Sequence, residues 1–230
     1  MKELAIVMPV YNEEGAIEQV VKKWVQLFRA EDIDFEFHIY NDGSKDQSGP
    51  LLDRLAKEFS ELKIHHKSNS GHGPTILQGY RENCRATWIF QIDSDDELGT
   101  NGFSKLWYQR YQYDFLIGTR KGRKAPFARK LITAVTAITV RVRYGKGIQD
   151  VNCPFRLMRS TIFRDLFHQI PTDTFAPNVI ISGFAAQERL RIFQVPIIHN
   201  FRQTGEVSIK HWKLFKAAVS SFWQTVKFKT

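Results

Sequence analysis

Four acidic residues follow a short apolar segment near the middle of this 230-residue chain. The segment 88–92 reads Trp-Ile-Phe-Gln-Ile, which is typical of a buried strand. The acids are Asp93, Asp95, Asp96 and Glu97. Carboxylates at a strand end are costly unless water, a cation or a basic partner meets them. Asp93 and Asp95 could share one divalent ion if the chain turns at Ser94, and Mg²⁺ or Mn²⁺ would suit their oxygens and bridge them to a diphosphate. A solvated acidic turn is the alternative for this motif taken alone.

The segments around this motif alternate between apolar runs of strand length and stretches with helical periodicity. The strands are predicted at 4–10, 35–40, 62–66, 88–92, 115–119 and 191–198, with a loop leading into a further strand at 150–159. The helices are predicted at 17–28, from Pro50, from Pro74, and at 103–111, 127–142 and 174–186, each proline taking the first helical position. This alternation is typical of a doubly wound α/β fold with a mainly parallel sheet. Ligands bind such sheets beyond the carboxyl ends of the strands, so we expect the polar loops there to form a nucleotide site.

The composition favours one globular domain. Hydrophobic residues make up 43% of the chain, enough for a substantial core. There is no apolar run of the roughly 18 residues that a membrane-spanning helix needs, and the first residues lack the features of a signal peptide. Cys84 and Cys153 do not have metal-site spacing, so we expect a reduced, cytoplasmic setting. The Gly71–Gly73 pair is too short for a dinucleotide fingerprint, so no nicotinamide cofactor is expected.

The net charge of +9 is concentrated in two segments. Residues 120–146 contain nine Lys or Arg and no acid, and residues 207–230 contain five Lys and no acid. Both also carry apolar residues at helical spacing, so each could lie in a membrane interface or cover the protein's own core. The second segment could instead form a dimer contact. Their charge indicates a polyanionic partner, whether a membrane surface, a nucleic acid or a phosphorylated substrate. We therefore predict a catalytic domain at 1–206, including the basic segment 120–146, and an amphipathic basic C-terminal helix at 207–230.

Several short motifs, taken together, resemble a known enzyme family. In the first half they are Pro9-Val-Tyr-Asn-Glu13, Asn41-Asp42-Gly-Ser44, Asn69-Ser-Gly71-His-Gly73 and Gln91-Ile-Asp93-Ser-Asp95. In order and spacing they are similar to the inverting glycosyltransferases of family 2, which have the GT-A fold. In the second half they are Gly118-Thr-Arg120, Arg129-Lys-Leu-Ile-Thr133, Asp150-Val-Asn-Cys-Pro-Phe-Arg156 and Arg202-Gln-Thr-Gly205. These look most like the dolichyl- or polyprenyl-phosphate sugar synthases, the dolichol-phosphate mannosyltransferase type within that family.

The resemblance implies roles for individual residues of these motifs. The nucleotide would be bound by Pro9, Tyr11, Glu13, Asp42, Asp93 and Ser94, with Asp42 on the base or ribose. Asp93 and Asp95 would hold Mg²⁺ or Mn²⁺ against the donor diphosphate. The acceptor's phosphate would be received by Arg120, Arg129 and Thr133. Arg202 would contact diphosphate oxygens, which the fork of an arginine suits. The residues implied in catalysis are then Asp95, Arg120, Arg129 and Arg202.

Some positions depart from the pattern of that family. They are Asn41, Ser94, Cys153, Pro154, Asn178 and Gln194. The resemblance leads us to expect an acid at position 41 and glutamates at 178 and 194. These departures bear on the acceptor and the sugar more than on the fold or the metal site.

The resulting hypothesis is transfer of a sugar, with inversion, from a UDP- or GDP-sugar to a polyprenyl or dolichyl phosphate. The enzyme would bind peripherally to the cytoplasmic face of a membrane, alone or with a membrane partner subunit. A phosphate acceptor is already anionic near neutral pH, so no protein base is required. The first alternative is a hydroxyl acceptor on a saccharide or lipid-linked sugar, which would need a carboxylate base. Candidates for that base are Asp96, Glu97 and Asp150.

Two further alternatives belong to other functional classes. One is a nucleotide- or nucleic-acid-binding module without catalysis, whose basic segments would meet phosphate backbones. The aromatic residues of the tail lie at helical spacing and are not interleaved with basic residues as stacking platforms, so no nucleic-acid partner is expected. The other is glycoside hydrolysis by paired carboxylates, against which the nucleotide-type loops argue.

Overall fold

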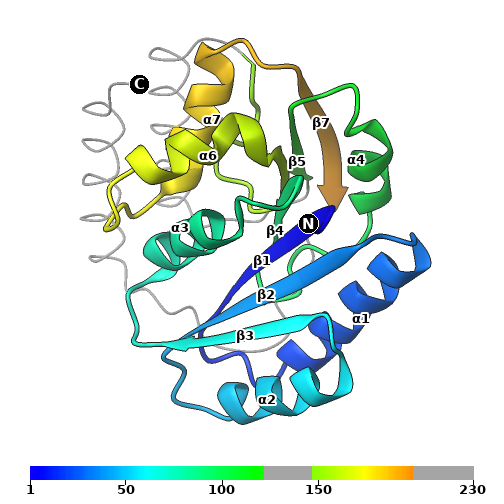
Figure 1. Ribbon diagram of the computed structural model, residues 1–230, viewed down its shortest axis with the longest axis vertical. Helices are drawn as coiled ribbons and strands as arrows, with labels where there is room; N and C mark the ends of the chain where they lie inside the picture. The colour runs from blue at the N-terminus through cyan, green and yellow to red at the C-terminus, as the bar shows by residue number, and fades with distance from the viewer. Residues whose placement is uncertain (122–146, 199–230) are drawn as a thin grey trace.

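A computed structural model describes residues 1–121 and 147–198, and within them seven strands form one sheet in the order β3-β2-β1-β4-β6-β5-β7 (Figure 1). The strands are β1 (Leu4–Val10), β2 (Phe35–Asp42), β3 (Leu62–Lys67), β4 (Trp88–Gln91), β5 (Phe115–Lys121), β6 (Arg156–Arg159) and β7 (Ile192–Ile198). The helices are α1 (Ile17–Ala30), α2 (Ser48–Glu58), α3 (His72–Asn83), α4 (Phe103–Gln109), α6 (Ser160–Gln169) and α7 (Pro177–Gln187). The predicted helix 127–142 and tail helix 207–230, with Arg129, Thr133 and Arg202, lie outside the described residues.

Six of these strands run in one direction and β6 runs in the other. β1 pairs in parallel with both β2 and β4, β2 pairs in parallel with β3, and β5 pairs in parallel with β7. β6 is antiparallel to both of its neighbours, β4 and β5. The carboxyl ends of six strands and the start of β6 therefore lie along one edge of the sheet, where the predicted site residues follow their strands.

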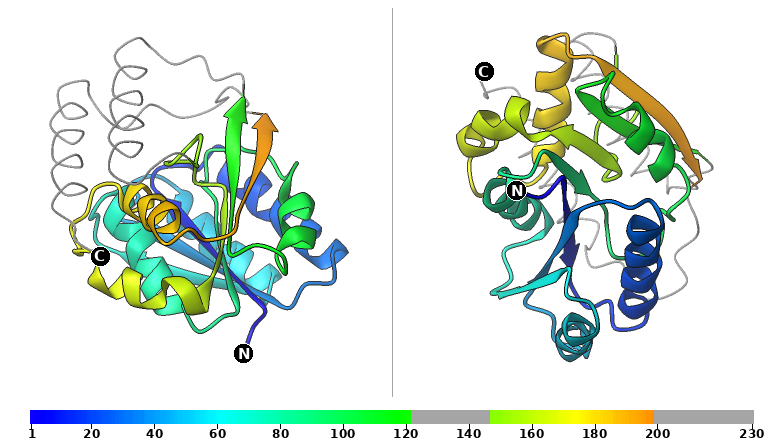
Figure 2. Two further views of the ribbon diagram at one scale, coloured as in Figure 1. Left: turned by 90° about the horizontal axis from the view of Figure 1, so that it is seen from above. Right: turned by 45° about the vertical axis from the view of Figure 1, so that its right-hand side comes forward.

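Helices cover both faces of the sheet. In Figures 1 and 2, α3, α6 and α7 lie together on one side, and α1, α2 and α4 lie on the other. Side-chain contacts agree with this arrangement, because Phe103 of α4 packs against Trp24 and Phe28 of α1, while Tyr80 of α3 stacks on Phe167 of α6. None of the helices in the described residues is long and apolar enough to cross a membrane.

The core follows from strands that are apolar on both faces. All seven residues of β1 are buried, as expected for a parallel strand with helices above and below it. On the α1 side an aromatic cluster joins Trp24, Phe28, Phe90, Phe103 and Phe155. Because Phe155 comes from the segment before β6, this cluster fixes the second half of the chain against the first.

The strands lie where the sequence predicts them, while three helix starts differ. Pro50 and Pro74 occupy the third position of α2 and α3, not the first. Proline is tolerated there because the first-turn N–H groups have no intrahelical partner. The predicted start of the helix 174–186 is wrong, since α7 begins at Pro177 and the preceding Ala176 has a non-helical backbone. Helix α6 was missed because it follows β6 directly, without a loop to mark it.

Candidate active site

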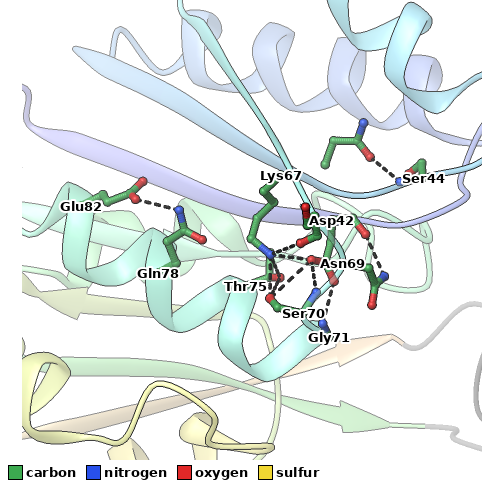
Figure 3. Close-up of polar contacts among 11 residues, drawn as sticks. Asp42, Ser44, Lys67, Asn69, Ser70, Gly71, Thr75, Gln78 and Glu82 are labelled. Carbon is green, nitrogen blue, oxygen red and sulfur yellow. Dashed lines mark hydrogen bonds and ion pairs between the residues drawn. The ribbon is translucent and has the colours of Figure 1, made fainter.

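The carboxylate of Asp42 lies at the end of β2 and is surrounded by donors (Figure 3). Its Oδ1 accepts from the Lys67 ammonium at 2.6 Å and from the Ser70 backbone N–H at 2.8 Å. Its Oδ2 accepts from the Gly71 backbone N–H at 2.8 Å. The Asn69 side chain donates to the backbone carbonyl of Asp42 at 2.7 Å. The loop between β3 and α3 is therefore bound to the end of β2.

Asp42 is only 3% exposed and nevertheless stays charged. Burial by itself would raise the pKa of this carboxyl group, but Lys67 and the two backbone N–H groups outweigh burial and hold the pKa below its usual value. Lys67 also donates to Ser70 Oγ at 2.6 Å and to Thr75 Oγ1 at 3.3 Å. Both oxygens of Asp42 already accept from protein groups, and its contact with a base or ribose stays a prediction.

The loops after β1 and β2 are joined by hydrogen bonds in both directions. The Asn12 N–H donates to Ser44 Oγ at 3.0 Å, and Asn12 Oδ1 accepts from the Lys45 N–H at 2.7 Å. The Glu13 N–H donates to Ser48 Oγ at 2.8 Å. Asn12 has φ of 55°, a left-handed conformation that asparagine adopts more readily than most residues. These bonds fix the relative position of two loops at the ligand edge of the sheet.

The residues predicted to bind the nucleotide from the first loop lie beside Asp42. Pro9 is buried in β1, opposite Tyr40 of β2. Glu13 is buried just before α1, and Tyr11 is half-buried between them. The structure thus brings the first and second motifs together, as the adjacent parallel strands require. The individual roles of these side chains stay predictions.

Asp93 follows β4 and is held by two donors. Its Oδ1 lies 3.1 Å from His72 Nε2 and accepts from Gln91 Nε2 at 3.4 Å. Burial would raise the pKa of the Asp93 carboxyl group, but the His72 imidazole and the Arg120 guanidinium outweigh burial and hold the pKa below its usual value. Arg120 belongs to β5, two strands away from β4 at the same edge of the sheet.

His72 lies among three acids and was not singled out from the sequence. Burial would lower the pKa of its imidazole, but the carboxylates of Asp93, Asp95 and Asp42 outweigh burial and raise that pKa above its usual value. The acids at the ends of β2 and β4 therefore lie within electrostatic reach of one side chain. The available signal was its position between the two glycines of the Asn69–Gly73 motif.

Asp93 and Asp95 present oxygen ligands on one turn. The chain bends at the buried Ser94, and Asp95 Oδ1 accepts from the Glu97 backbone N–H at 3.2 Å, so the acidic segment turns as predicted. In the parts of the chain that the structure describes, no three His, Cys, Asp or Glu side chains converge as a metal cluster. Two carboxylates still fit Mg²⁺ or Mn²⁺, because such ions take their remaining ligands from phosphates and water.

Arg120 is paired with Asp150 at the same edge. Arg120 Nε donates to Asp150 Oδ2 at 2.6 Å and Nη2 donates to Oδ1 at 2.8 Å, with 12% and 16% of the two side chains exposed. Burial would lower the pKa of the guanidinium, but Asp150 outweighs burial and raises it. A two-point ion pair of this kind fixes the plane of an arginine. Arg120 is therefore a permanently charged and oriented group near Asp93.

The loop that carries Asp150 is fastened by an amide where a glutamate was expected. Gln194 Nε2 donates to the Gly147 carbonyl at 2.6 Å, and Gln194 Oε1 accepts from the Gln149 N–H at 2.8 Å. A glutamate could only accept, whereas this position needs a donor and an acceptor. The Ser182 hydroxyl donates to the Val151 carbonyl at 2.7 Å and holds the following residue.

Arg156 is a second arginine that the sequence motifs contain, and its environment is entirely different. It is 0% exposed. Its guanidinium donates to the backbone carbonyls of Val151, Cys153 and Asn178 at 2.8 to 3.1 Å. Burial lowers its pKa. We interpret Arg156 as a structural residue whose hydrogen bonds join the Asp150 loop to α7, and not as a phosphate-binding group.

Solved structures of the same architecture define the fold as GT-A. Glucosyl-3-phosphoglycerate synthase from Mycobacterium tuberculosis, in complex with Mn²⁺, UDP-glucose and phosphoglyceric acid, matches with a TM-score of 0.70 at 13% identity, over 100% of this chain and 81% of that one. Mannosyl-3-phosphoglycerate synthase from Rubrobacter xylanophilus matches with a TM-score of 0.68 at 12% identity, over 98% and 73%.

Sequence comparison then gives the family. The family described as "Glycosyl transferase family 2" matches residues 5–167, which include every element from β1 to most of α6. This chain belongs to glycosyl transferase family 2. The resemblance of its motifs to that family and the predicted GT-A fold are thereby confirmed.

Curated relatives are similar over most of this chain. Undecaprenyl-phosphate 4-deoxy-4-formamido-L-arabinose transferase of Edwardsiella ictaluri is 23% identical over 206 residues, covering 88% of this chain and 62% of the relative. The protein of the same name from Pseudomonas fluorescens (strain SBW25) is 25% identical, covering 88% and 59%. The chain thus spans about three fifths of the length of these relatives.

Proposed function

We propose that this glycosyltransferase moves a sugar from a UDP- or GDP-sugar to a polyprenyl or dolichyl phosphate, with inversion, using Mg²⁺ or Mn²⁺. The observation that carries the proposal is the position of Arg120. Its guanidinium is oriented by Asp150 and acts electrostatically on Asp93. A fixed cation beside the acidic motif suits an anionic acceptor next to an anionic donor. The curated relatives, which are undecaprenyl-phosphate 4-deoxy-4-formamido-L-arabinose transferases, support a lipid phosphate as acceptor.

The proposed reaction is a single displacement. An oxygen of the acceptor phosphate attacks the anomeric carbon of the sugar from the face opposite the nucleotide, and the nucleoside diphosphate leaves with the bonding electrons. The attacking oxygen is already anionic near neutral pH, so no proton has to be removed. Arg120 would hold the acceptor phosphate, while Asp93 and Asp95 would hold the divalent ion, which neutralises charge on the departing diphosphate. Pro9, Tyr11, Glu13, Ser94 and Asp42 would position the nucleotide.

The contacts of two of the three candidate bases, Asp150 and Asp96, count against a hydroxyl acceptor. Both carboxylate oxygens of Asp150 accept from Arg120, so neither is directed at a substrate proton. Asp96 Oδ2 accepts from Lys23 of α1 at 2.9 Å. A phosphate acceptor needs no such base, which favours it over a hydroxyl.

The remaining parts of the proposal concern the membrane. A long polyprenyl chain is insoluble in water, so the enzyme would work at a membrane surface, on its cytoplasmic face, alone or beside a membrane partner subunit. The basic segments 120–146 and 207–230 would supply the attachment. Arg129 and Thr133 would join Arg120 on the acceptor phosphate, and Arg202 would contact the donor diphosphate.

A panel of radiolabelled nucleotide sugars, offered with a short polyprenyl phosphate and Mn²⁺ or Mg²⁺, tests the reaction. We expect a product that partitions into organic solvent, that is absent with EDTA and that Asp95→Ala does not form. The anomeric configuration of the product, determined by NMR, tests inversion. Donor binding without any lipid product would contradict the acceptor assignment, and product formation that is unaffected by EDTA would contradict the role of the metal.

A further inference from the structure

A chain of buried amides runs from the acidic motif into the second half of the molecule. Gln91 is the last residue of β4 and is fully buried, and its Nε2 donates to Asp93 Oδ1. Its Oε1 accepts from Asn178 Nδ2 at 2.8 Å. The hydroxyl of Tyr80 lies within hydrogen-bonding distance of both Gln91 Oε1 and Asn178 Oδ1. Strand β4 and helices α3 and α7 thus meet at one buried polar cluster.

The direction of each hydrogen bond in this cluster follows from the carboxylate at its end. An ionised carboxylate can only accept, so the amide of Gln91 must turn its N–H₂ toward Asp93. The amide oxygen of Gln91 then faces inward and needs a donor, because a buried unsatisfied oxygen is costly. Asn178 supplies that donor. A glutamate or aspartate at position 178 would place one acceptor against another.

This order explains why an amide replaces the carboxylate expected at position 178. Asn178 is 2% exposed, so a charged side chain there would also carry a large desolvation cost. Its backbone carbonyl accepts from Arg156 Nη1 at 3.1 Å, which fixes the start of α7. Gln91 and Asn178 therefore form a matched pair of amides, with the Tyr80 hydroxyl as their shared neighbour.

We propose that Gln91 and Asn178 are positioning residues for the metal-binding carboxylate Asp93. Gln91 of this cluster and His72 both contact Oδ1 of Asp93, and neither contacts Oδ2. The partners of a ligating carboxylate fix its orientation and raise metal affinity, typically by a factor of about 10 to 100. The inference rests on the proposed metal role of Asp93, and it assigns part of that role to a helix almost 90 residues later in the sequence.

Mn²⁺ binding to the complete chain, titrated with UDP present and read from the electron paramagnetic resonance of free Mn²⁺, tests this inference. Asn178→Asp keeps the size of the side chain and removes its donor. Gln91→Met removes the contact with Asp93. We expect each to raise the Kd for Mn²⁺ about tenfold. Tyr80→Phe keeps the ring stacked on Phe167 and should raise the Kd by a smaller factor.

Asn83 provides a matched control. It is also a buried amide of α3, but it bonds to the Tyr40 hydroxyl at 2.9 Å and to the Gly79 carbonyl at 2.8 Å, away from the acidic motif. Asn83→Ala should lower the melting temperature and leave the Kd for Mn²⁺ unchanged. An unchanged Kd in Gln91→Met and Tyr80→Phe, or an equal rise in Asn83→Ala, would overturn the inference.

Two outcomes separate this inference from the proposed reaction. A wild-type chain that binds Mn²⁺ but transfers no sugar to polyprenyl phosphate would contradict the proposed acceptor, and the comparison of variants would still decide the positioning role. A wild-type chain that does not bind Mn²⁺ in the presence of UDP would overturn both the metal role of Asp93 and the positioning inference.

Discussion

The acids at the ends of β2 and β4, the two strands that flank β1, have contrasting surroundings. Asp42 is almost completely buried, and an ammonium group and two backbone N–H groups donate to its two oxygens. Asp93 has 29% of its side chain exposed, and His72 and Gln91 both contact the same oxygen, Oδ1. Both carboxylates are ionised, but for different reasons and with different capacity left for a ligand.

This difference shows that two acids of similar sequence context, Asp42 and Asp93, can differ in how much of the carboxylate remains available to a ligand. A carboxylate whose lone pairs are used by the protein organises a loop, because its charge cannot leave those donors without a large cost. A carboxylate with one oxygen held by the protein is oriented and can still meet a cation. Similar sequence signals, an acid after an apolar strand, therefore lead to two environments that only the surrounding contacts distinguish.

Removing the saturated acid should have the largest effect on stability. Asp42→Ala leaves the Lys67 ammonium largely buried without its carboxylate, which we expect to cost about 3 to 5 kcal/mol of unfolding free energy. Urea denaturation followed by circular dichroism measures this loss. The double variant Asp42→Ala/Lys67→Met is the control and should recover part of it. A loss below about 1 kcal/mol in the single variant would contradict the structural role of Asp42.

Removing Asp95, which we propose to be a metal ligand, should lower the rate of sugar transfer and leave the fold intact. Asp95→Ala is expected to lower the rate of sugar transfer about a hundredfold or more, near 3 kcal/mol of transition-state stabilisation. Its unfolding free energy should stay within about 0.5 kcal/mol of the wild type, since Asp95 is partly exposed. Steady-state kinetics and urea denaturation of the same preparation make the test. If Asp95→Ala loses both activity and stability, the contrast between Asp95 and the structural Asp42 would be contradicted.

A buried imidazole without full compensation should respond to pH. Burial and the neighbouring His65 lower the pKa of His38 to about 4, against the opposing effect of Glu36. The pKa of His38 is lower in the folded protein than the value near 6.5 expected for the unfolded chain. The unfolding free energy is therefore highest above pH 6.5 and decreases as the pH falls toward 4. Between pH 7 and pH 4.5 we expect a loss of about 2 to 3 kcal/mol that His38→Gln does not show. Equal acid sensitivity in both proteins would contradict this assignment.

An exposed pair of the same residue types gives the smallest expected effect. Lys23 and Asp96 form an ion pair at 2.9 Å, with 44% and 33% of the side chains exposed. Solvent screens such a pair, so Lys23→Ala should cost less than about 0.5 kcal/mol of unfolding free energy. Comparing it with Lys67→Ala under the same conditions isolates the contribution of burial. A similar loss for both lysines would contradict the comparison.

The sequence predicts the elements in which local pattern and burial agree. All seven residues of β1 are apolar or proline and were predicted within the observed bounds, because a strand covered on both faces leaves no polar position. The acidic turn at Asp93 and Asp95 was also located correctly, since it interrupts an apolar run. These features depend on residues close together in the sequence, and the spacing of apolar residues indicates them directly.

The features that the sequence does not predict depend on partners far apart in the chain. The pairings of Arg120 with Asp150, and of Gln91 with Asn178, join residues 30 and 87 positions apart. The insertion of β6, in reverse direction, between β4 and β5 is likewise a matter of topology. A residue type alone does not reveal which of two arginines meets a carboxylate and which meets backbone carbonyls.

The antiparallel pairing of β5 with β6 also has a consequence for engineering. The segment before β6 lies beside the end of β5. The Gly118 N–H donates to the Phe155 carbonyl at 2.8 Å, and Arg120 forms an ion pair with Asp150. When the two ends of a segment are already held together, each doubling of its length adds only about 0.6 kcal/mol to the entropic cost of closing the loop. Replacing the stretch between these two contacts with that of another family member is therefore expected to leave the sheet and the acids at its edge in place.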